Sequence, residues 1–164
     1  MKKRFGFEAK AVWLDAHGNI RHRQEWTHNN LMNEGERNIF DAYLRGLNVP
    51  TAFWVKLYAD TPVETDSLSS LSNEPGGLLG YSPQQITRDA TGWPTLGESG
   101  GDAEIISREL TFRATSGTWP AVTHAVLATS SDSSGKLVDA TALDQTQQLA
   151  SGEQIILTYR PVLQ

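Results

Sequence analysis

The sequence predicts a mainly β protein, an antiparallel β-sandwich of jelly-roll type that carries one short α-helix. Apolar and polar residues alternate in seven or eight segments separated by Gly-, Ser-, Asn- or Pro-rich turns, which is the pattern of half-buried strands. Residues 34–45 alone combine helical apolar spacing with start and stop signals. A chain of 164 residues can bury a substantial core, so we predict a single domain over residues 1–164.

The first two strands are expected to form a hairpin. Apolar residues occupy every second position from Phe5 to Trp13. Asp15–Asn19 then supplies turn residues, and the chain returns as a more polar strand from Ile20 to Trp26. The composition of the second strand predicts that one face of the hairpin meets water.

The helix is predicted from residues that are typical of helix ends. Asn33 suits an N-cap, Glu36 completes a capping box, and Gly46 stands where a left-handed residue ends a helix. The apolar side chains form one stripe that is expected to pack on the β-sandwich: Ile39, Phe40, Tyr43 and Leu44.

The middle of the chain alternates between strands and long connections. The clearest strand runs from Phe53 to Ala59, with apolar residues on both faces, so we expect it to be covered on both sides. Residues 60–80 are rich in Thr, Ser, Pro and Gly and predict a long loop. An edge strand is expected within 81–89, followed by a second Gly-rich connection at 90–102.

The C-terminal third predicts further strands. Apolar alternation, turn residues and β-branched side chains place them at 103–114, 122–129, 136–138 and 154–162.

Several of these segments, taken in order, carry a resemblance to a known family. Asn30-Leu31, Gly35 and Ile39 are followed by the strand Phe53–Tyr58, and the later matching segments are Gly80-Tyr81-Ser82, Leu110–Ala114, Gly117-Thr118-Trp119 and Gly152–Leu157. This order resembles a family of small tailed-phage virion proteins, in which a hairpin leads through an Asn-Leu-x-x-x-Gly-x-x-x-Ile segment into a strand and a variable loop. The resemblance implies a structural role and supplies no catalytic residues.

Composition narrows the possible partners. Fourteen Lys and Arg against nineteen Asp and Glu give a net charge of −5, which disfavours nucleic-acid binding. The sequence has no apolar span long enough to cross a membrane. Cysteine is absent and the four histidines lack metal-ligand spacing, so we predict no metal and no cofactor.

Carboxylates gather in two places without an enzyme motif. Any two could in principle form a glycosidase pair, but the first group is explained by helix N-terminal preference and a solvated face, and the second by a polar loop. We therefore predict that the protein is not an enzyme. The two groups are Glu34, Glu36 and Asp41, and Asp60, Glu64 and Asp66.

The leading hypothesis is a capsid decoration or cement protein on the outer surface of a phage particle, made in the host cytoplasm. Its expected partners are the major capsid protein or tail proteins of the same phage, and we expect a homo-oligomer, with a trimer as the working guess. The residues predicted to make these contacts are the basic Lys2, Lys3 and Arg4, the loop residues Leu68, Leu71, Leu78 and Leu79, and Trp93.

Two alternatives stay open on sequence alone. One is a tail or baseplate adaptor, or a small fibre component, of the same phage. The other is a carbohydrate-binding module that uses exposed tryptophans such as Trp93 and Trp119 as platforms for sugar rings.

Overall fold

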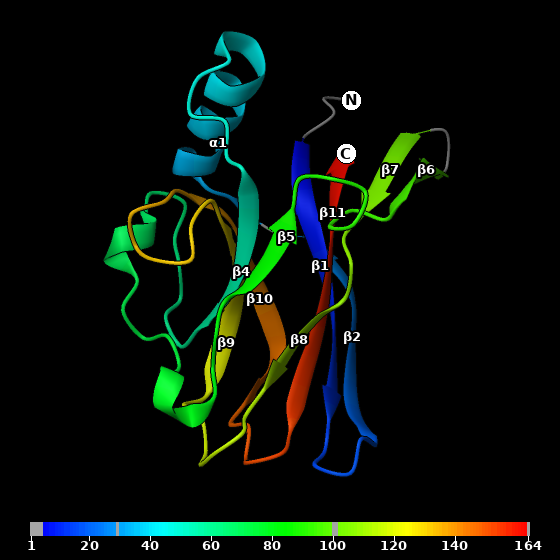
Figure 1. Ribbon diagram of the computed structural model, residues 1–164, viewed down its shortest axis with the longest axis vertical. Helices are drawn as coiled ribbons and strands as arrows, with labels where there is room; N and C mark the ends of the chain where they lie inside the picture. The colour runs from blue at the N-terminus through cyan, green and yellow to red at the C-terminus, as the bar shows by residue number, and fades with distance from the viewer. Residues whose placement is uncertain (1–4, 29, 100–101, 164) are drawn as a thin grey trace.

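The computed structural model describes residues 5–28, 30–99 and 102–163, and it is a β-sandwich (Figure 1). A four-stranded sheet has the order β2-β1-β11-β8, a five-stranded sheet has the order β3-β10-β9-β4-β5, and β6 and β7 form a separate hairpin. All recorded strand pairings among the described residues are antiparallel. The predicted mainly β antiparallel sandwich with one α-helix is confirmed.

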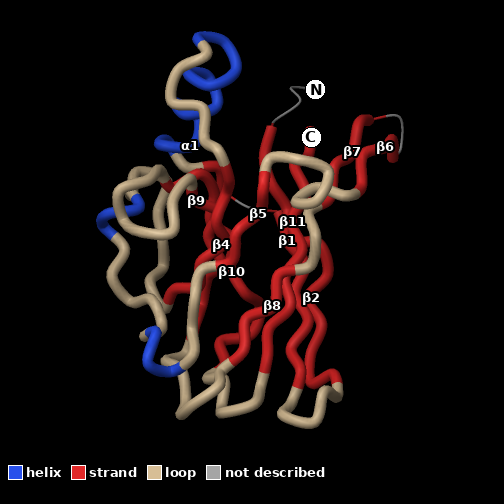
Figure 2. Tube along the Cα trace, viewed as in Figure 1, coloured by secondary structure: helices blue, strands red, loops and turns tan. Residues whose placement is uncertain are grey.

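The strands are β1 (Phe5–Leu14), β2 (Ile20–His28), β3 (Asn30–Leu31), β4 (Ala52–Tyr58), β5 (Gln84–Thr87), β6 (Thr95–Ser99), β7 (Asp102–Ile106), β8 (Leu110–Arg113), β9 (Val122–Ala128), β10 (Leu137–Gln147) and β11 (Gln154–Leu163). The helical segments are α1 (Asn33–Phe40), a π-helical turn η1 (Asp41–Arg45), and the 3₁₀ turns η2 (Leu68–Ser70) and η3 (Gly77–Leu79). Figure 2 shows these helical segments at the periphery of the sheets.

The main core lies between the two large sheets. The alternating residues of β1 point into it, as the sequence predicted, with Trp13 only 1% exposed. Val55 and Leu57 on β4 meet them from the five-stranded sheet and are fully buried. Such burial of alternate side chains fixes the register of each strand, because a slip by one residue would turn the apolar set outward.

A second, smaller core covers the outer face of the five-stranded sheet. Tyr58 on β4 and Val126 on β9 face outward and are buried under Leu68 of the 60–80 segment. The prediction that the 53–59 strand is covered on both faces is therefore confirmed. The 60–80 segment acts as a third layer over the sheet.

The two ends of the described chain lie side by side. β1 and β11 pair over ten residues, from Phe5 opposite Leu163 to Leu14 opposite Gln154. The start of β1 and the end of β11 lie at the same end of the sandwich, from which α1 and the β6–β7 hairpin also project (Figure 1). No helix in the described ranges is long and apolar enough to cross a membrane.

The helix begins one residue earlier than predicted. Met32, not Asn33, is the N-cap; its backbone is extended and it makes no side-chain cap hydrogen bond. The predicted Asn33–Glu36 capping box is therefore wrong, because Asn33 is already helical and its amide donates to the carbonyl of Glu64. The predicted end is confirmed for the helical segment as a whole: α1 passes into the π-helical turn η1, and Gly46, with a left-handed φ of 65°, ends it.

Two strands differ from the sequence prediction. The expected Gly-rich connection at 90–102 contains β6, which pairs with β7 as a hairpin outside the main sheets and so lacks a buried alternation. The short strand expected at 136–138 extends to Gln147. Its continuation contains Asp139, Ala140, Ala142 and Asp144, residue types that are depleted in strands, and pairing with β9 holds it in place.

Candidate interaction surface

A close approach fixes the start of α1 against the sheet. Gly35 is buried, and a Cβ atom at this position would lie 2.2 Å from the carbonyl oxygen of Val138 on β10. Only glycine allows the helix to contact the strand at this distance. The residues after Gly35 then carry the helix away from the sandwich (Figures 1 and 2).

Glu34 ties three parts of the chain together at the same place. Its Oε2 accepts hydrogen bonds from the backbone amides of Leu137, at 2.9 Å, and Leu68, at 3.1 Å. Lys136 Nζ lies 3.4 Å from its Oε1. Burial alone would raise the pKa of Glu34, but the two amide hydrogen bonds and the lysine charge outweigh burial and lower it. Glu34 is thus an anchor for the helix, not part of a solvated face.

The far part of the helix exposes its apolar stripe. Tyr43 is 87% exposed, Leu44 71% and Phe40 61%. The prediction that this stripe packs on the sandwich is therefore wrong for these three side chains. Leu47 and Val49, in the segment that returns to β4, are about half exposed as well. We call Phe40, Tyr43, Leu44, Leu47 and Val49 the apolar knob.

Polar contacts hold the backbone of the knob in a defined shape. The carboxylate of Asp41 accepts hydrogen bonds from Arg45 Nη1, at 2.7 Å, and from Asn48 Nδ2, at 3.2 Å. Asn38 Nδ2 donates to the carbonyl oxygen of Asn48 at 3.0 Å. Asn48 itself has a φ of 50°, which asparagine tolerates better than most residues. The knob is therefore a folded projection.

An apolar groove of about 300 Å³ lies beside the knob. Trp93 stands edge-on to Phe53 on its wall, with ring centroids 6.3 Å apart. A second hollow of about 420 Å³ continues past Trp93 to Leu96, which is 77% exposed. The first hollow, which we call the apolar groove, is lined by Phe7, Asn38, Ile39, Ala42, Tyr43, Pro50, Phe53, Arg88, Trp93, Ile105, Val138 and Pro161.

One arginine holds the β6–β7 hairpin, which carries Ile105 of the groove. Arg160 on β11 donates to Glu104 of β7 at 2.7 Å and to Glu8 of β1 at 2.7 and 2.9 Å. Its guanidinium carbon lies 4.3 Å from the ring centroid of Trp26. These charge-assisted bonds connect the hairpin to the four-stranded sheet.

The residues predicted to bind partners do not form one surface. Leu68 is fully buried in the outer core, and Leu71 packs against the same cluster. Leu78 is 97% exposed on η3, whereas Leu79 packs partly into the main core. Trp93 alone belongs to the apolar groove. The other three predicted residues, Lys2, Lys3 and Arg4, lie outside the described residues.

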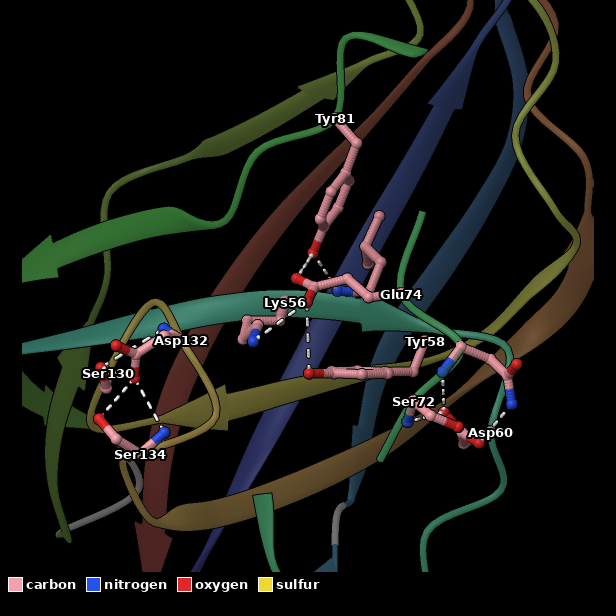
Figure 3. A network of polar contacts seen from close by, with 11 residues as sticks. Lys56, Tyr58, Asp60, Ser72, Glu74, Tyr81, Ser130, Asp132 and Ser134 are labelled. Carbon is pink, nitrogen blue, oxygen red and sulfur yellow. Dashed lines mark hydrogen bonds and ion pairs between the residues drawn. The ribbon is translucent and has the colours of Figure 1, made fainter. Parts of the chain in front are cut away.

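The 60–80 segment is attached to β4 by a buried ion pair (Figure 3). Lys56 Nζ lies 3.1 Å from Glu74 Oε2, and the lysine side chain is 3% exposed. Tyr81 donates to Glu74 Oε1 at 2.6 Å and accepts from the amide of Leu57 at 2.9 Å. Burial would lower the pKa of Lys56, but the contact with Tyr58 and the charge of Glu74 raise it.

Two other carboxylates hold loops together by accepting hydrogen bonds from nearby residues. Asp60 accepts from the amides of Ser72 and Asn73. Asp132 accepts from Ser130 and from the amide and hydroxyl of Ser134, and these bonds lower its pKa to about 2 (Figure 3). The expected turn at 130–135 is thus organised by one aspartate. No group of three or more His, Asp or Glu side chains gathers as a metal site among the residues described.

Trp119 does not offer a platform to a sugar. It is 1% exposed, packs edge-on against Tyr81, and its Nε1 donates to the carbonyl oxygen of Leu79 at 3.0 Å. Its role is to anchor the loop before β5.

Sequence reasoning missed the knob and the groove as a site. The signal was present in the apolar stripe of residues 39–44, because α1 is the one α-helix among the described residues and has no second helix to pack against. The sequence pattern by itself predicts that the stripe is buried on the sandwich, because an amphipathic helix usually covers its own domain. The groove residues, in contrast, come from distant segments, and Trp93 is the single one of them that the sequence predicts as a contact residue.

The fold and this surface define a class: a β-sandwich domain with an exposed apolar end, which the apolar knob and the apolar groove form. Large exposed apolar patches mark interaction sites. The chain belongs to the podophage GP4 fiber I protein gp80 family, whose sequence profile matches residues 30–161. It is accordingly a member of a tailed-phage virion structural protein family, as the resemblance implied. No curated protein matches the chain. The matched region contains α1, the knob and most of the groove.

Proposed function

We propose that this protein is a non-enzymatic structural component of the tail fibres of a podophage. The family match over residues 30–161 is the observation that carries the proposal. It favours the fibre alternative over capsid decoration, which had been the leading hypothesis from sequence.

The architecture supports a role in assembly. Two of the carboxylates that could have served an enzyme, Glu34 and Asp60, bind backbone amides instead. The exposed apolar end supplies the kind of surface by which subunits associate. In this proposal the partners are other tail proteins of the same virion.

The proposal is tested by locating the protein on intact particles. Gold-labelled antibody against the folded chain, viewed by electron microscopy on purified virions, is expected to mark the tail. Label spread over the heads would instead support a decoration protein and overturn the fibre assignment. Particles without label would show that the protein is not an accessible virion component.

A further inference from the structure

The second hollow, beside the apolar groove, has a different kind of lining. Its volume is about 420 Å³, and its charged lining residues are Arg88 and Asp89. Trp93 is half-buried and lines both hollows, so its indole forms a shared wall. A volume of this size lies within the range of about 300–1,000 Å³ seen for small-molecule sites. The second hollow is therefore large enough for one small ligand.

Hydrogen bonds fix the loop between β5 and β6, which carries most of this lining. Asp89 Oδ1 accepts from Thr87 Oγ1 at 2.7 Å. The same oxygen accepts from the amides of Thr91 and Gly92, both at 2.9 Å. The amide of Trp93 donates to the carbonyl oxygen of Asp89, also at 2.9 Å. The loop is thus held in shape before any ligand binds, which reduces the entropy that binding would cost.

Two charged groups of the lining remain open to a ligand. Asp89 Oδ2, unlike Oδ1, accepts no hydrogen bond from the described residues. Arg88 donates through Nη1 to the carbonyl oxygen of Pro50 at 2.7 Å, and within the described ranges no carboxylate pairs with it. Hydrogen bonds from the amide of Gly92 and the hydroxyl of Thr87 hold the pKa of Asp89 below its ordinary value of 3.8, so it is an anion at neutral pH.

We propose that the second hollow binds one pyranose ring of a saccharide. The indole of Trp93 packs against the apolar C–H face of the ring. Arg88 donates hydrogen bonds to one hydroxyl group and Asp89 accepts from its neighbour, which suits a ligand whose hydroxyls both donate and accept. This inference goes beyond the proposed virion role and does not depend on it, because purified chain and simple sugars test it.

The charges of the hollow favour a neutral sugar over other small ligands. Arg88 and Asp89 carry opposite charges, so an anion would face the carboxylate and a cation the guanidinium. A ligand without hydroxyls could fill the apolar part near Leu96 and Ile105. It would, however, shield both charged groups from water without replacing the lost hydrogen bonds, which is unfavourable.

Nuclear magnetic resonance of the nitrogen-labelled chain tests the site. The probes are methyl glucoside, methyl galactoside and methyl mannoside. At least one of them is expected to bind in the millimolar range and to shift the amide signals of residues 88–94 and the indole signal of Trp93. Tetrahydropyran, the same ring without hydroxyls, should bind at least about tenfold more weakly, because it makes no hydrogen bonds to the charged pair.

Substitutions identify the residues that bind. Trp93→Ala should raise the dissociation constant at least about tenfold, whereas Trp93→Phe keeps an aromatic face and should stay within about threefold of the wild type. Arg88→Gln should weaken binding at least about fivefold, because its charged donors are lost. Arg113→Gln, at an exposed arginine of β8, is the matched control and should bind like the wild type. Circular dichroism checks that each variant remains folded.

Three results would overturn the inference. One is the absence of shifts at residues 88–94 with all three methyl glycosides at high concentration. Another is equal binding of tetrahydropyran and the glycosides, which would show an apolar hollow only. The third is binding of glucuronate without binding of any neutral glycoside, which would show an anion site at Arg88. None of these results bears on whether the protein is part of the tail, so the two proposals fail separately.

Discussion

Glu34 Oε2 accepts a 2.9 Å hydrogen bond from the backbone amide of Leu137, 103 positions later in the chain. The same oxygen accepts from Leu68 of the loop that covers the outer core. One carboxylate therefore links α1, the five-stranded sheet and the 60–80 segment. The position of the end of the molecule that carries the apolar knob and the apolar groove depends on this link.

Glu34→Gln should destabilise the protein by about 1–3 kcal/mol, because two backbone amides lose a charged acceptor. The measurement is urea unfolding at neutral pH. Glu36→Gln, at the exposed carboxylate two residues on, is the control and should change stability by less than about 0.5 kcal/mol. Equal effects of the two substitutions would contradict the anchoring role.

The contribution of Glu34 should disappear in acid. The pKa of its carboxyl is lower in the folded protein than the ordinary value of 4.5, so its stabilisation is fully present above that value. It is lost as pH falls through the folded pKa. The difference in unfolding free energy between wild type and Glu34→Gln should therefore be constant near neutrality and shrink below about pH 4.5. A difference that grows on acidification would contradict this linkage.

Gly35→Ala should destabilise the protein by about 1–3 kcal/mol, because the new methyl group meets the backbone of Val138. Thermal unfolding measures the loss, and hydrogen exchange should show α1 opening more often. Gly76→Ala, where an added Cβ meets nothing within 4 Å and φ is −73°, should be neutral or slightly stabilising. An unchanged melting temperature for Gly35→Ala would mean that the helix does not need this close approach.

Glu74→Gln should cost about 3–5 kcal/mol, because it leaves the buried ammonium of Lys56 without its counter-charge. Glu64→Gln, an exposed position in the same segment, is the control. The folded pKa of Lys56 is raised above the ordinary 10.5, so the pair stabilises the fold below that pH and stops doing so as pH rises beyond it. The gap between wild type and Glu74→Gln should close only in strong alkali; a gap that closes near neutral pH would refute the ion-pair account.

Arg160→Gln should loosen the β6–β7 hairpin, because Glu104 loses its charge-assisted bond to the four-stranded sheet. Hydrogen exchange of residues 95–99 and 102–106 is expected to accelerate about tenfold or more, as a local loss of about 1.4 kcal/mol implies. Arg113→Gln, at an exposed arginine of β8, should leave these amides unchanged. Equal exchange rates in both variants would show that other contacts hold the hairpin.

Local sequence signals predicted much of the fold. The alternation from Phe5 to Trp13 and the turn at Asp15–Asn19 correspond to β1 and the turn after it, where Asp15 accepts from the amides of His17 and Asn19. Gly46 marked the end of the helix correctly. These features depend on residues close in sequence, so their patterns are visible without the fold.

The features that failed depend on distant contacts. β10 runs on through Asp139, Ala140 and Ala142 because β9 pairs with it, although these residue types are depleted in strands. The stripe of Phe40, Tyr43 and Leu44 has the spacing of a buried helix face, and sequence alone cannot tell burial in the same chain from burial in a partner. The groove joins residues from five strands, the helical segment 33–45 and two loops, so no single segment predicts it.

The most direct test of the account is incorporation into virions. A phage that lacks this gene is complemented with wild-type chain, Leu44→Asp or Leu78→Asp, and the amount of the chain in purified particles is measured by quantitative mass spectrometry. Exclusion of Leu44→Asp together with normal incorporation of Leu78→Asp is the predicted result, because only the first alters the apolar knob. Equal incorporation of the two variants would contradict the central claim that the apolar end assembles this protein into the particle.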